Sequence, residues 1–207
     1  MSIIKSHAVT LKFVKDRYTI VLLPLCDEHL PLLYKWNSDP EVLYWTEGGE
    51  DVERCYNEET VQEIYGGVSQ NSFCFLVVVD DYPIGDCWLQ RMNNPKIRDL
   101  YPGKDVRRID MAIGEKEYWG KGIGTEFVSM LVHFAFYNEK VDVLHCFAED
   151  YNVRSQRVWI KNGFRHSLTE ELKQPQKGRK QFHFVLTREE YLARQDMPIS
   201  KKERRQV

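Results

Sequence analysis

The sequence has no apolar run long enough to cross a membrane as a helix. No stretch of about 18 apolar residues occurs, and the first residues, Met-Ser-Ile-Ile-Lys, lack the apolar segment of a secretion signal. Cysteine is scarce: the five cysteines are widely spaced and include no Cys-x₂-Cys pair. They are Cys26, Cys55, Cys74, Cys87 and Cys146. A disulfide framework and a zinc site are both disfavoured, so we expect a cytoplasmic protein with no bound metal.

A basic stripe of the kind that binds nucleic acid is also missing, because the net charge is only −2 and one segment is strongly acidic. Between positions 39 and 63, nine acidic residues accompany a single basic residue, Arg54, which gives a local charge of −8. Tyr44, Trp45 and Glu47 lie in this segment, which favours a loop that attracts a cationic ligand and stacks on a ring. A solvated acidic helix with a loop before it would have the same composition, and both interpretations stay open here.

Length and composition predict one domain. A chain of 207 residues with 43% apolar content can bury a sizeable core. We assign residues 1–195 to this domain and residues 196–207 to a basic tail that is flexible or binds a partner. The aromatic content of 13% would allow a homodimer interface.

Hydrophobic periodicity predicts both strands and helices. Strands are expected at residues 9–14, 17–23, 73–79, 84–92, 108–114, 144–148 and 181–187. Helices are expected at residues 30–37 and 126–136, and between Asn152 and Gly163. Such a mixture predicts an α/β (α+β) fold, in which helices flank a mixed central sheet.

A glycine loop joins the strand at 108–114 to the helix that follows. Gly120, Gly122 and Gly124 occupy alternate positions, so the backbone can approach an anion that the helix N-terminus also attracts. The spacing fits neither a Walker loop nor a dinucleotide loop, which argues against the phosphates of ATP or NAD. A tight turn without a ligand is the alternative.

A second motif follows about 30 residues later. Asn152 is placed to cap a helix, and Gly163 to end it with a positive φ angle. Ser155 and Trp159 lie on the helix between them. Alone, this motif is equally typical of an ordinary capped helix.

Together the two motifs, with the strands before them, resemble the GNAT superfamily of acetyl-CoA-dependent N-acetyltransferases. The resemblance covers roughly residues 106–168 and implies an enzyme that uses acetyl-CoA as co-substrate. It implies coenzyme contacts from the strand, the loop and the second helix. These residues are Met111, Ala112, Ile113, Trp119, Gly120, Lys121, Gly122, Ile123, Gly124, Thr125, Asn152, Ser155 and Trp159.

Two positions depart from the family pattern. Trp119 stands where the family usually has Arg or Gln, so one phosphate contact is missing. Trp159 stands where many members have a Tyr that protonates the leaving thiolate, and an indole N–H is no useful acid near neutral pH.

Asp110 is the candidate catalytic residue. Strand alternation places it on the face opposite Ile109 and Met111, from where its carboxylate could orient an amine or accept its proton through water. A surface ion pair with Arg107 or Arg108 is the alternative interpretation.

Further short motifs lie at Asp39-Pro-Glu-Val-Leu43, Gly48-Gly49, Pro83-Ile-Gly85, Tyr101-Pro102, Ile109-Asp110 and Tyr118-Trp-Gly-Lys-Gly-Ile-Gly-Thr125. Taken together they resemble the aminoglycoside 6′-N-acetyltransferases, and the resemblance implies that Asp110 matches the catalytic strand Asp of that family. The family's Asp-Pro before the motif Asn is replaced by Phe147-Ala148, with Glu149 close by. We therefore expect a cationic small-molecule amine as acceptor, with Tyr44, Trp45, Glu47, Asp110 and Glu149 as its contacts.

Two other functions stay open. The same motifs resemble ribosomal-protein N-terminal and polyamine acetyltransferases, whose acceptors are also cationic. A non-catalytic acyl-CoA-binding module would explain the loss of both the loop Arg or Gln and the helix Tyr. Release of free thiol from acetyl-CoA in the presence of an amine separates an enzyme from such a module.

Overall fold

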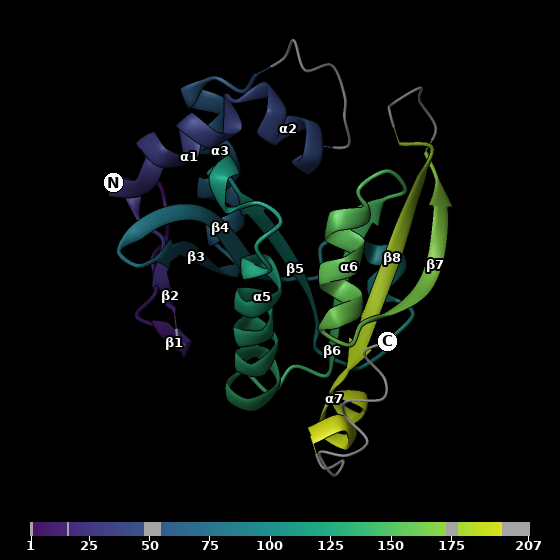
Figure 1. Ribbon diagram of the computed structural model, residues 1–207. Coiled ribbons are helices and arrows are strands. Elements are labelled where there is room, and N and C mark those ends of the chain that lie inside the picture. Colours follow the sequence, from purple (N-terminus) through teal and green to yellow (C-terminus); the bar gives the residue numbers. More distant parts are fainter. Residues whose placement is uncertain (1, 16, 48–54, 173–177, 196–207) are drawn as a thin grey trace.

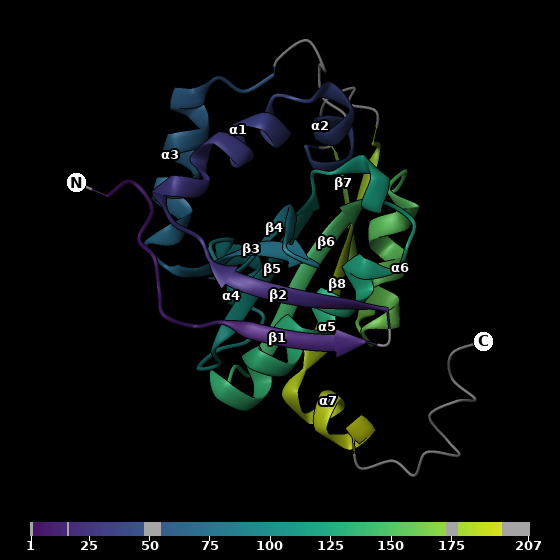
Figure 2. The same ribbon diagram turned by 60° about the vertical axis from the view of Figure 1, so that its left-hand side comes forward.

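The computed structural model describes residues 2–15, 17–47, 55–172 and 178–195. One mixed sheet runs through these residues in the order β1-β2-β3-β4-β5-β6-β8-β7, with helices on both of its faces (Figures 1 and 2). Its strands are β1 (Leu11–Lys15), β2 (Tyr18–Pro24), β3 (Ser72–Val79), β4 (Tyr82–Arg91), β5 (Val106–Ile113), β6 (Val143–Glu149), β7 (Arg165–Glu171) and β8 (Lys180–Thr187). The prediction of a mixed α/β sheet is confirmed.

The helices divide into two groups. The helices are α1 (Leu30–Asn37), α2 (Pro40–Thr46), α3 (Glu58–Ser69), α4 (Pro95–Arg98), α5 (Ile123–His133), α6 (Val153–Lys161) and α7 (Arg188–Gln195). Short 3₁₀ turns lie at Asp27–His29 and Lys116–Tyr118, and a π-helical turn at Phe134–Asn138 follows α5. One core contains Phe127 of α5 and Trp159 of α6, while a second contains Trp36 of α1 and Tyr65 of α3. The two cores lie on opposite sides of the sheet.

The sheet opens between its two halves. The strands β1 to β5 pair as an antiparallel meander, whereas β5 and β6 run parallel. Their pairing covers only Val106–Arg108 on β5 and Val143–His145 on β6. Beyond these residues the two strands separate, and the exposed backbone of β5 lines the opening.

Most expected elements are present. The helix at Leu30–Asn37 has the predicted limits, and the predicted hairpin at β3 and β4 turns at Asp80 and Asp81, whose φ angles are 48° and 69°. Such positive angles are typical of a two-residue hairpin turn.

Two details of the sequence prediction are wrong, and one choice that it left open is decided. The helix after the glycine loop begins at Ile123 instead of Glu126, so Gly124 lies inside its first turn. The segment around Tyr44 and Trp45 is a helix and not a loop, because Asp39 accepts hydrogen bonds from Glu41 N (2.8 Å) and Val42 N (3.4 Å). The strand at Lys180–Thr187 does not close the sheet at an edge but lies between β6 and β7.

Candidate active site

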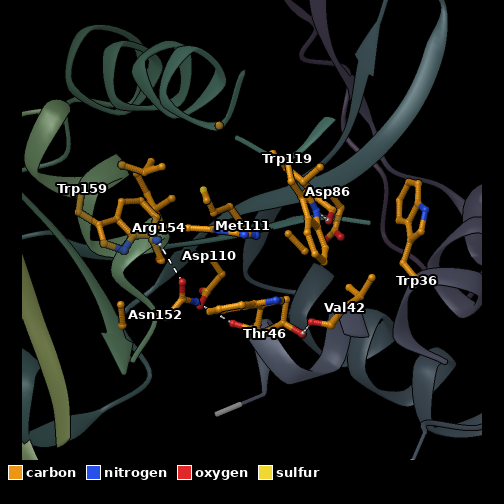
Figure 3. Close-up of a pocket in the computed structure, with 18 of the residues that line it drawn as sticks. Trp36, Val42, Thr46, Asp86, Asp110, Met111, Trp119, Asn152, Arg154 and Trp159 are labelled. Atoms are coloured by element: carbon orange, nitrogen blue, oxygen red, sulfur yellow. Dashed lines mark hydrogen bonds between the residues drawn. The ribbon is translucent and has the colours of Figure 1, made fainter. Parts of the chain in front are cut away.

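A cavity of about 500 Å³ occupies the opening between β5 and β6. Figure 3 shows side chains of α6 on one side of it, and Trp36 of α1 and Val42 of α2 on the other. The glycine loop lines the cavity as well, together with Met111, Ala112 and Ile113 of β5. The two sequence motifs therefore meet in one place, together with the helices of the N-terminal half.

The glycine loop has the geometry expected of an anion site. Gly120 and Gly122 have φ angles of +72° and +82°, which favour glycine. Gly122 is the N-cap of α5, and none of the described side chains caps this helix end. Thr125 N donates to Gly122 O at 3.0 Å, whereas the N–H groups of Ile123 and Gly124 before it have no acceptor among the described residues and are left for a ligand.

Gly124 lies where β5, α5 and α6 meet. A Cβ atom at this position would lie 3.6 Å from Ile113 Cδ1, Met111 Cε and Val158 Cγ2. That is an ordinary van der Waals distance, so Gly124 is not required by sterics alone.

Trp119 does not point to the anion site through its indole N–H. Its Nε1 donates to Ile113 O at 2.7 Å, which ties the loop back to β5. This bond is consistent with the expectation that Trp119 does not supply the phosphate contact that Arg or Gln usually makes at this position.

Arg154 is a cavity residue that the sequence reasoning missed. Its guanidinium lies 5.0 Å from the Trp45 ring centroid and 5.6 Å from that of Trp119 (Figure 3). Arg157 and Lys161 of the same helix also line the cavity. The spacing of these three basic residues along α6 is the signal that could have identified them.

Asn152 has two roles that the sequence did not distinguish. Its Oδ1 accepts from Ser155 N (3.1 Å), which confirms the predicted cap, and its Nδ2 donates to Trp45 O (2.8 Å). Tyr151 similarly donates its hydroxyl to Tyr44 O at 2.7 Å. The end of α2 is thus held against the start of α6, across the cavity.

Trp159 is buried and lines the cavity, yet its Nε1 has no hydrogen-bond acceptor among the described residues.

Most residues expected to contact the acceptor substrate line the cavity. Trp45, Glu47, Asp110 and Glu149 do so, whereas Tyr44 packs beside Trp45 outside the lining. Tyr56 donates to Glu47 Oε2 (2.9 Å), and Gln181 donates to Glu149 Oε1 (3.1 Å).

Only part of the acidic segment faces the cavity. Asp39 and Glu41 form ion pairs with Lys116 at 2.9 and 3.1 Å. Glu58 and Glu59 lie in the first turn of α3, where acidic side chains complement the helix dipole. Gly48, Gly49, Glu50, Asp51 and Glu53 lie outside the described residues.

Asp110 faces the cavity on the side of the sheet covered by α1 and α3, as strand alternation predicts. Its Oδ2 accepts from Gln90 Nε2 (2.8 Å) and from Arg108 Nε (2.7 Å). The ion pair with Arg108, which was the alternative interpretation, is therefore present too. Both bonds end on Oδ2, so Oδ1 has no partner in the described part of the protein.

Asp86 is a second cavity carboxyl that the sequence reasoning missed. It is 5% exposed, and burial raises its pKa to about 7, with a further contribution from the charge of Asp110. Tyr65 donates to its Oδ2 at 3.2 Å, which partly offsets this rise in pKa. The sequence feature that could have identified Asp86 is that it is the one carboxylate in the apolar strand expected at residues 84–92.

No group of three or more His, Cys, Asp or Glu side chains in the described residues is arranged to hold a metal ion. Nor does any helix within the described ranges have the length and apolar character needed to span a membrane.

Known proteins are similar to this chain in sequence or in architecture. An aminoglycoside N(6′)-acetyltransferase type 1 from Klebsiella pneumoniae is 26% identical over 162 residues, covering 72% of this chain and 76% of the relative. A solved structure of the aminoglycoside acetyltransferase AAC(6′)-Ib with ribostamycin and coenzyme A is 25% identical, with a TM-score of 0.67, 86% of this chain covered and 97% of the other. A ribosomal L7/L12 α-N-protein acetyltransferase shares the fold at 11% identity, with a TM-score of 0.67, and 86% and 98% of the two chains covered.

The sequence profile of the acetyltransferase (GNAT) domain matches residues 19–165, which include all of β2 but its first residue, the strands β3 to β6, the glycine loop and α6. This match spans most of the chain and contains both motifs that line the cavity. The chain belongs to the GNAT acetyltransferase family.

Proposed function

We propose that this acetyltransferase transfers the acetyl group of acetyl-CoA to a primary amine of a cationic, aminoglycoside-like small molecule. The observation that carries the proposal is the single cavity that joins an uncapped helix N-terminus and glycine loop to the carboxylates Asp86, Asp110 and Glu149. One end suits an anionic coenzyme and the other a cationic acceptor.

The residues present fit coenzyme A. The loop from Gly120 to Gly124 offers backbone N–H groups to a pyrophosphate, whereas the N–H of Thr125 donates to Gly122 O at 3.0 Å. Arg154 adds a cation close by. Met111, Ala112 and Ile113 pair with β4 along one edge of β5, and the opposite edge no longer pairs with β6. Backbone groups on this open edge can hydrogen-bond the amide groups of the pantetheine arm, except Ile113 O, which already accepts from Trp119 Nε1. Trp119, Asn152, Ser155 and Trp159 complete the wall of this part of the cavity.

The reaction that we propose is direct attack by the amine. The acceptor ammonium loses one proton, directly or through water, to the free Oδ1 of Asp110, which also orients the nitrogen. The amine then attacks the thioester carbon, the C–N bond forms and the C–S bond breaks. The second proton of the nitrogen passes to the departing thiolate, so that the products are an amide and free coenzyme A.

A covalent acyl-enzyme is not part of this proposal. Cys74, Cys87 and Cys146 are buried, and burial raises the pKa of each thiol. Cys26 and Cys55 do not line the cavity. Without an activated thiol at the site, N–H groups of β5 would polarise the thioester carbonyl for attack by the amine itself.

The aminoglycoside class is supported by the similarity to the Klebsiella relative and by the resemblance of the Ile109-Asp110 strand to that of the aminoglycoside 6′-N-acetyltransferases. Acetylation of an amino group removes a positive charge from such a drug, and we propose antibiotic resistance as the consequence in the cell. We also propose a cytoplasmic location, where acetyl-CoA is available.

Thiol release from acetyl-CoA tests the acceptor. We expect turnover with a kanamycin-type drug that carries a 6′-amino group and none with its 6′-hydroxy analogue. Turnover only with spermidine or with peptides that have free N-termini would instead identify a polyamine or ribosomal-protein acetyltransferase. Tight coenzyme A binding with no thiol release for any amine would contradict the proposed enzyme.

A further inference from the structure

Asp86 is a buried carboxyl whose hydrogen bonds are incomplete. Asn37 donates to the Tyr65 hydroxyl (3.2 Å), and Tyr65 donates to Asp86 Oδ2 (3.2 Å), so this chain of bonds orients the carboxyl group. Asp86 Oδ1 is buried and has no hydrogen-bond partner among the described residues. An unsatisfied buried oxygen of this kind is costly unless a ligand completes it.

The surroundings of Asp86 contain no compensating positive charge. Asp86 forms no ion pair with any described residue, in contrast to Asp110, which is paired with Arg108. Four titratable groups interact electrostatically with Asp86. They are Tyr65 of α3, Cys74 of β3, Cys87 next to Asp86 on β4, and Asp110 of β5. All of these are neutral or negative, and Arg108 is already paired with Asp110, so no described cation neutralises Asp86 when it is ionised.

The neighbouring wall is aromatic and has one unused donor. The rings of Tyr65 and Trp88 lie 5.4 Å apart and both line the cavity, as does Trp36. Trp88 Nε1 is buried without an acceptor in the described structure. Aromatic faces beside a carboxylate favour a cation, and an indole N–H requires an oxygen or nitrogen acceptor.

We propose that Asp86, with Tyr65 and Trp88, forms a subsite that binds a second ammonium group of the acceptor, next to a hydroxyl or ether oxygen. The proposal rests on the proposed function, because it assigns the reacting amine to Asp110 and the anchoring amine to Asp86. The ammonium donates to Asp86 Oδ1, and the oxygen accepts from Trp88 Nε1.

The positions of the two carboxylates define the acceptor further. Asp86 pairs with Ala112 across the antiparallel strands β4 and β5, so Asp110 is its diagonal neighbour on the same face. The Cα atoms of diagonal neighbours lie roughly 7–8 Å apart. The acceptor class is therefore a polyamino alcohol with at least two amino groups that can reach two neighbouring carboxylates at the same time.

The affinity of this subsite for the anchoring ammonium should depend on pH. Burial raises the pKa of Asp86 to about 7, so the group is neutral below that pH and negative above it. The anchoring ammonium therefore binds more tightly as the pH rises from 6 to 8. The Tyr65 hydroxyl and the Cys74 thiol keep their protons over this range, because their pKa values are raised by burial.

The test is the steady-state kinetics of Asp86→Asn with kanamycin at saturating acetyl-CoA. We expect KM for kanamycin to rise at least tenfold, while kcat changes less than twofold and the wild-type fall in KM between pH 6 and 8 disappears. Asp99→Asn is the matched control, since Asp99 is an exposed carboxyl at the end of α4, outside the cavity lining. An unchanged KM overturns the proposal, and so does a loss of kcat with KM unchanged, which would make Asp86 a proton acceptor.

A binding measurement separates this proposal from the proposed function. Kanamycin, spermidine and butylamine are titrated calorimetrically into the coenzyme A complexes of wild type and Asp86→Asn, after thermal unfolding has shown that both are folded. Kanamycin binding that is at least tenfold weaker in the variant supports the subsite even if no amine is turned over. Equal affinity in both proteins, no binding to wild type, or binding of butylamine as tight as that of kanamycin overturns it.

Discussion

The carboxylate of Asp110 forms an ion pair with the guanidinium of Arg108, and this ion pair limits the chemistry that the carboxylate can perform. Arg108 and Gln90 hold Oδ2, so the side chain has one fixed oxygen and one free oxygen directed to the cavity. Such a group is better suited to orienting an ammonium and passing a proton to water than to acting as a strong base.

Replacing Asp110 with Ala should lower kcat by about 10- to 1,000-fold, in the lower range of general acid–base effects. The amine would lose its orienting acceptor, while the coenzyme contacts of β5 would be retained. Thiol release at saturating acetyl-CoA measures this effect. If kcat and KM both stay at wild-type values, Asp110 has only a structural role and the proposed mechanism is wrong.

The residues of the site differ in how well a single sequence can identify them. Alternation of apolar residues placed Asp110 correctly, because it needs only the strand itself. Asp86 lies on an equally clear strand, but its burial depends on Tyr65 of α3, which comes from a different part of the chain. Likewise, the bond from Asn152 to Trp45 O joins residues 107 positions apart, and no local pattern encodes it.

The glycine loop and α5 act as one element. Gly122 has a φ angle of +82°, and a Cβ atom added there would meet nothing within 4 Å. A side chain at this position is therefore disfavoured by the positive φ angle and not by a steric clash. A β-branched residue would shift the loop toward a negative φ, at a cost of about 1–2 kcal/mol.

We therefore expect Gly122→Val to raise KM for acetyl-CoA about tenfold and to change kcat little, since the N–H groups no longer converge on the phosphate. Gly103→Val is the matched control: Gly103 has φ +75° and equally open space, but lies outside the cavity lining. Initial rates at varied acetyl-CoA give both constants. Equal coenzyme KM in the two variants and wild type would refute the assignment of the loop.

The contact between α1 and the end of β5 depends on a missing side chain. A Cβ atom at Gly114 would lie 2.0 Å from Trp36 Cγ, inside the buried ring that lines the cavity. Trp36 cannot move freely, because its Nε1 donates to Glu115 at 2.8 Å.

Gly114→Ala should therefore reduce the free energy of unfolding by about 1–3 kcal/mol, the usual cost of overpacking. Urea denaturation measures the change. Gly67→Ala, in the exposed part of α3 with nothing within 4 Å, should instead stabilise by up to about 1 kcal/mol. A midpoint for Gly114→Ala at or above that of wild type would show that α1 can adjust.

Elements with a clear apolar period were predictable, and those without one were not. The strand β7 reads Arg-His-Ser-Leu-Thr-Glu-Glu and is mostly exposed, because it lies at the sheet edge and only Leu168 is partly covered. Helix α2 was missed for another reason, since Pro40 looks like a helix end until its position after the capping Asp39 is known.

On the scale of the whole molecule, two buried groups make stability depend on pH in opposite directions. Burial raises the pKa of Asp86 from 3.8 to about 7, so its contribution to stability is lost as the pH rises through that interval. Burial lowers the pKa of His145 from 6.5 to about 3, with a further lowering from His183 and Arg108. Its contribution is present above 6.5 and is lost as the pH falls.

Asp86→Asn removes one of these opposing effects. The difference in unfolding free energy between variant and wild type should become more favourable to the variant by up to about 4 kcal/mol from pH 4 to pH 8. The variant should also lose stability more steeply on acidification, because His145 is then unopposed. Urea denaturation across this pH range measures both effects, and a constant difference would contradict them.

The position of β8 between β6 and β7 has a consequence for synthesis on the ribosome. A growing chain releases β6 first, then β7, and β8 only afterwards, yet β6 and β7 each pair with β8 and not with one another. Until β8 emerges, both strands present unpaired edges that can associate with other nascent chains. The pairing of this end of the sheet is thus completed late in translation, and the open edges of β6 and β7 persist until Lys180–Thr187 has been made.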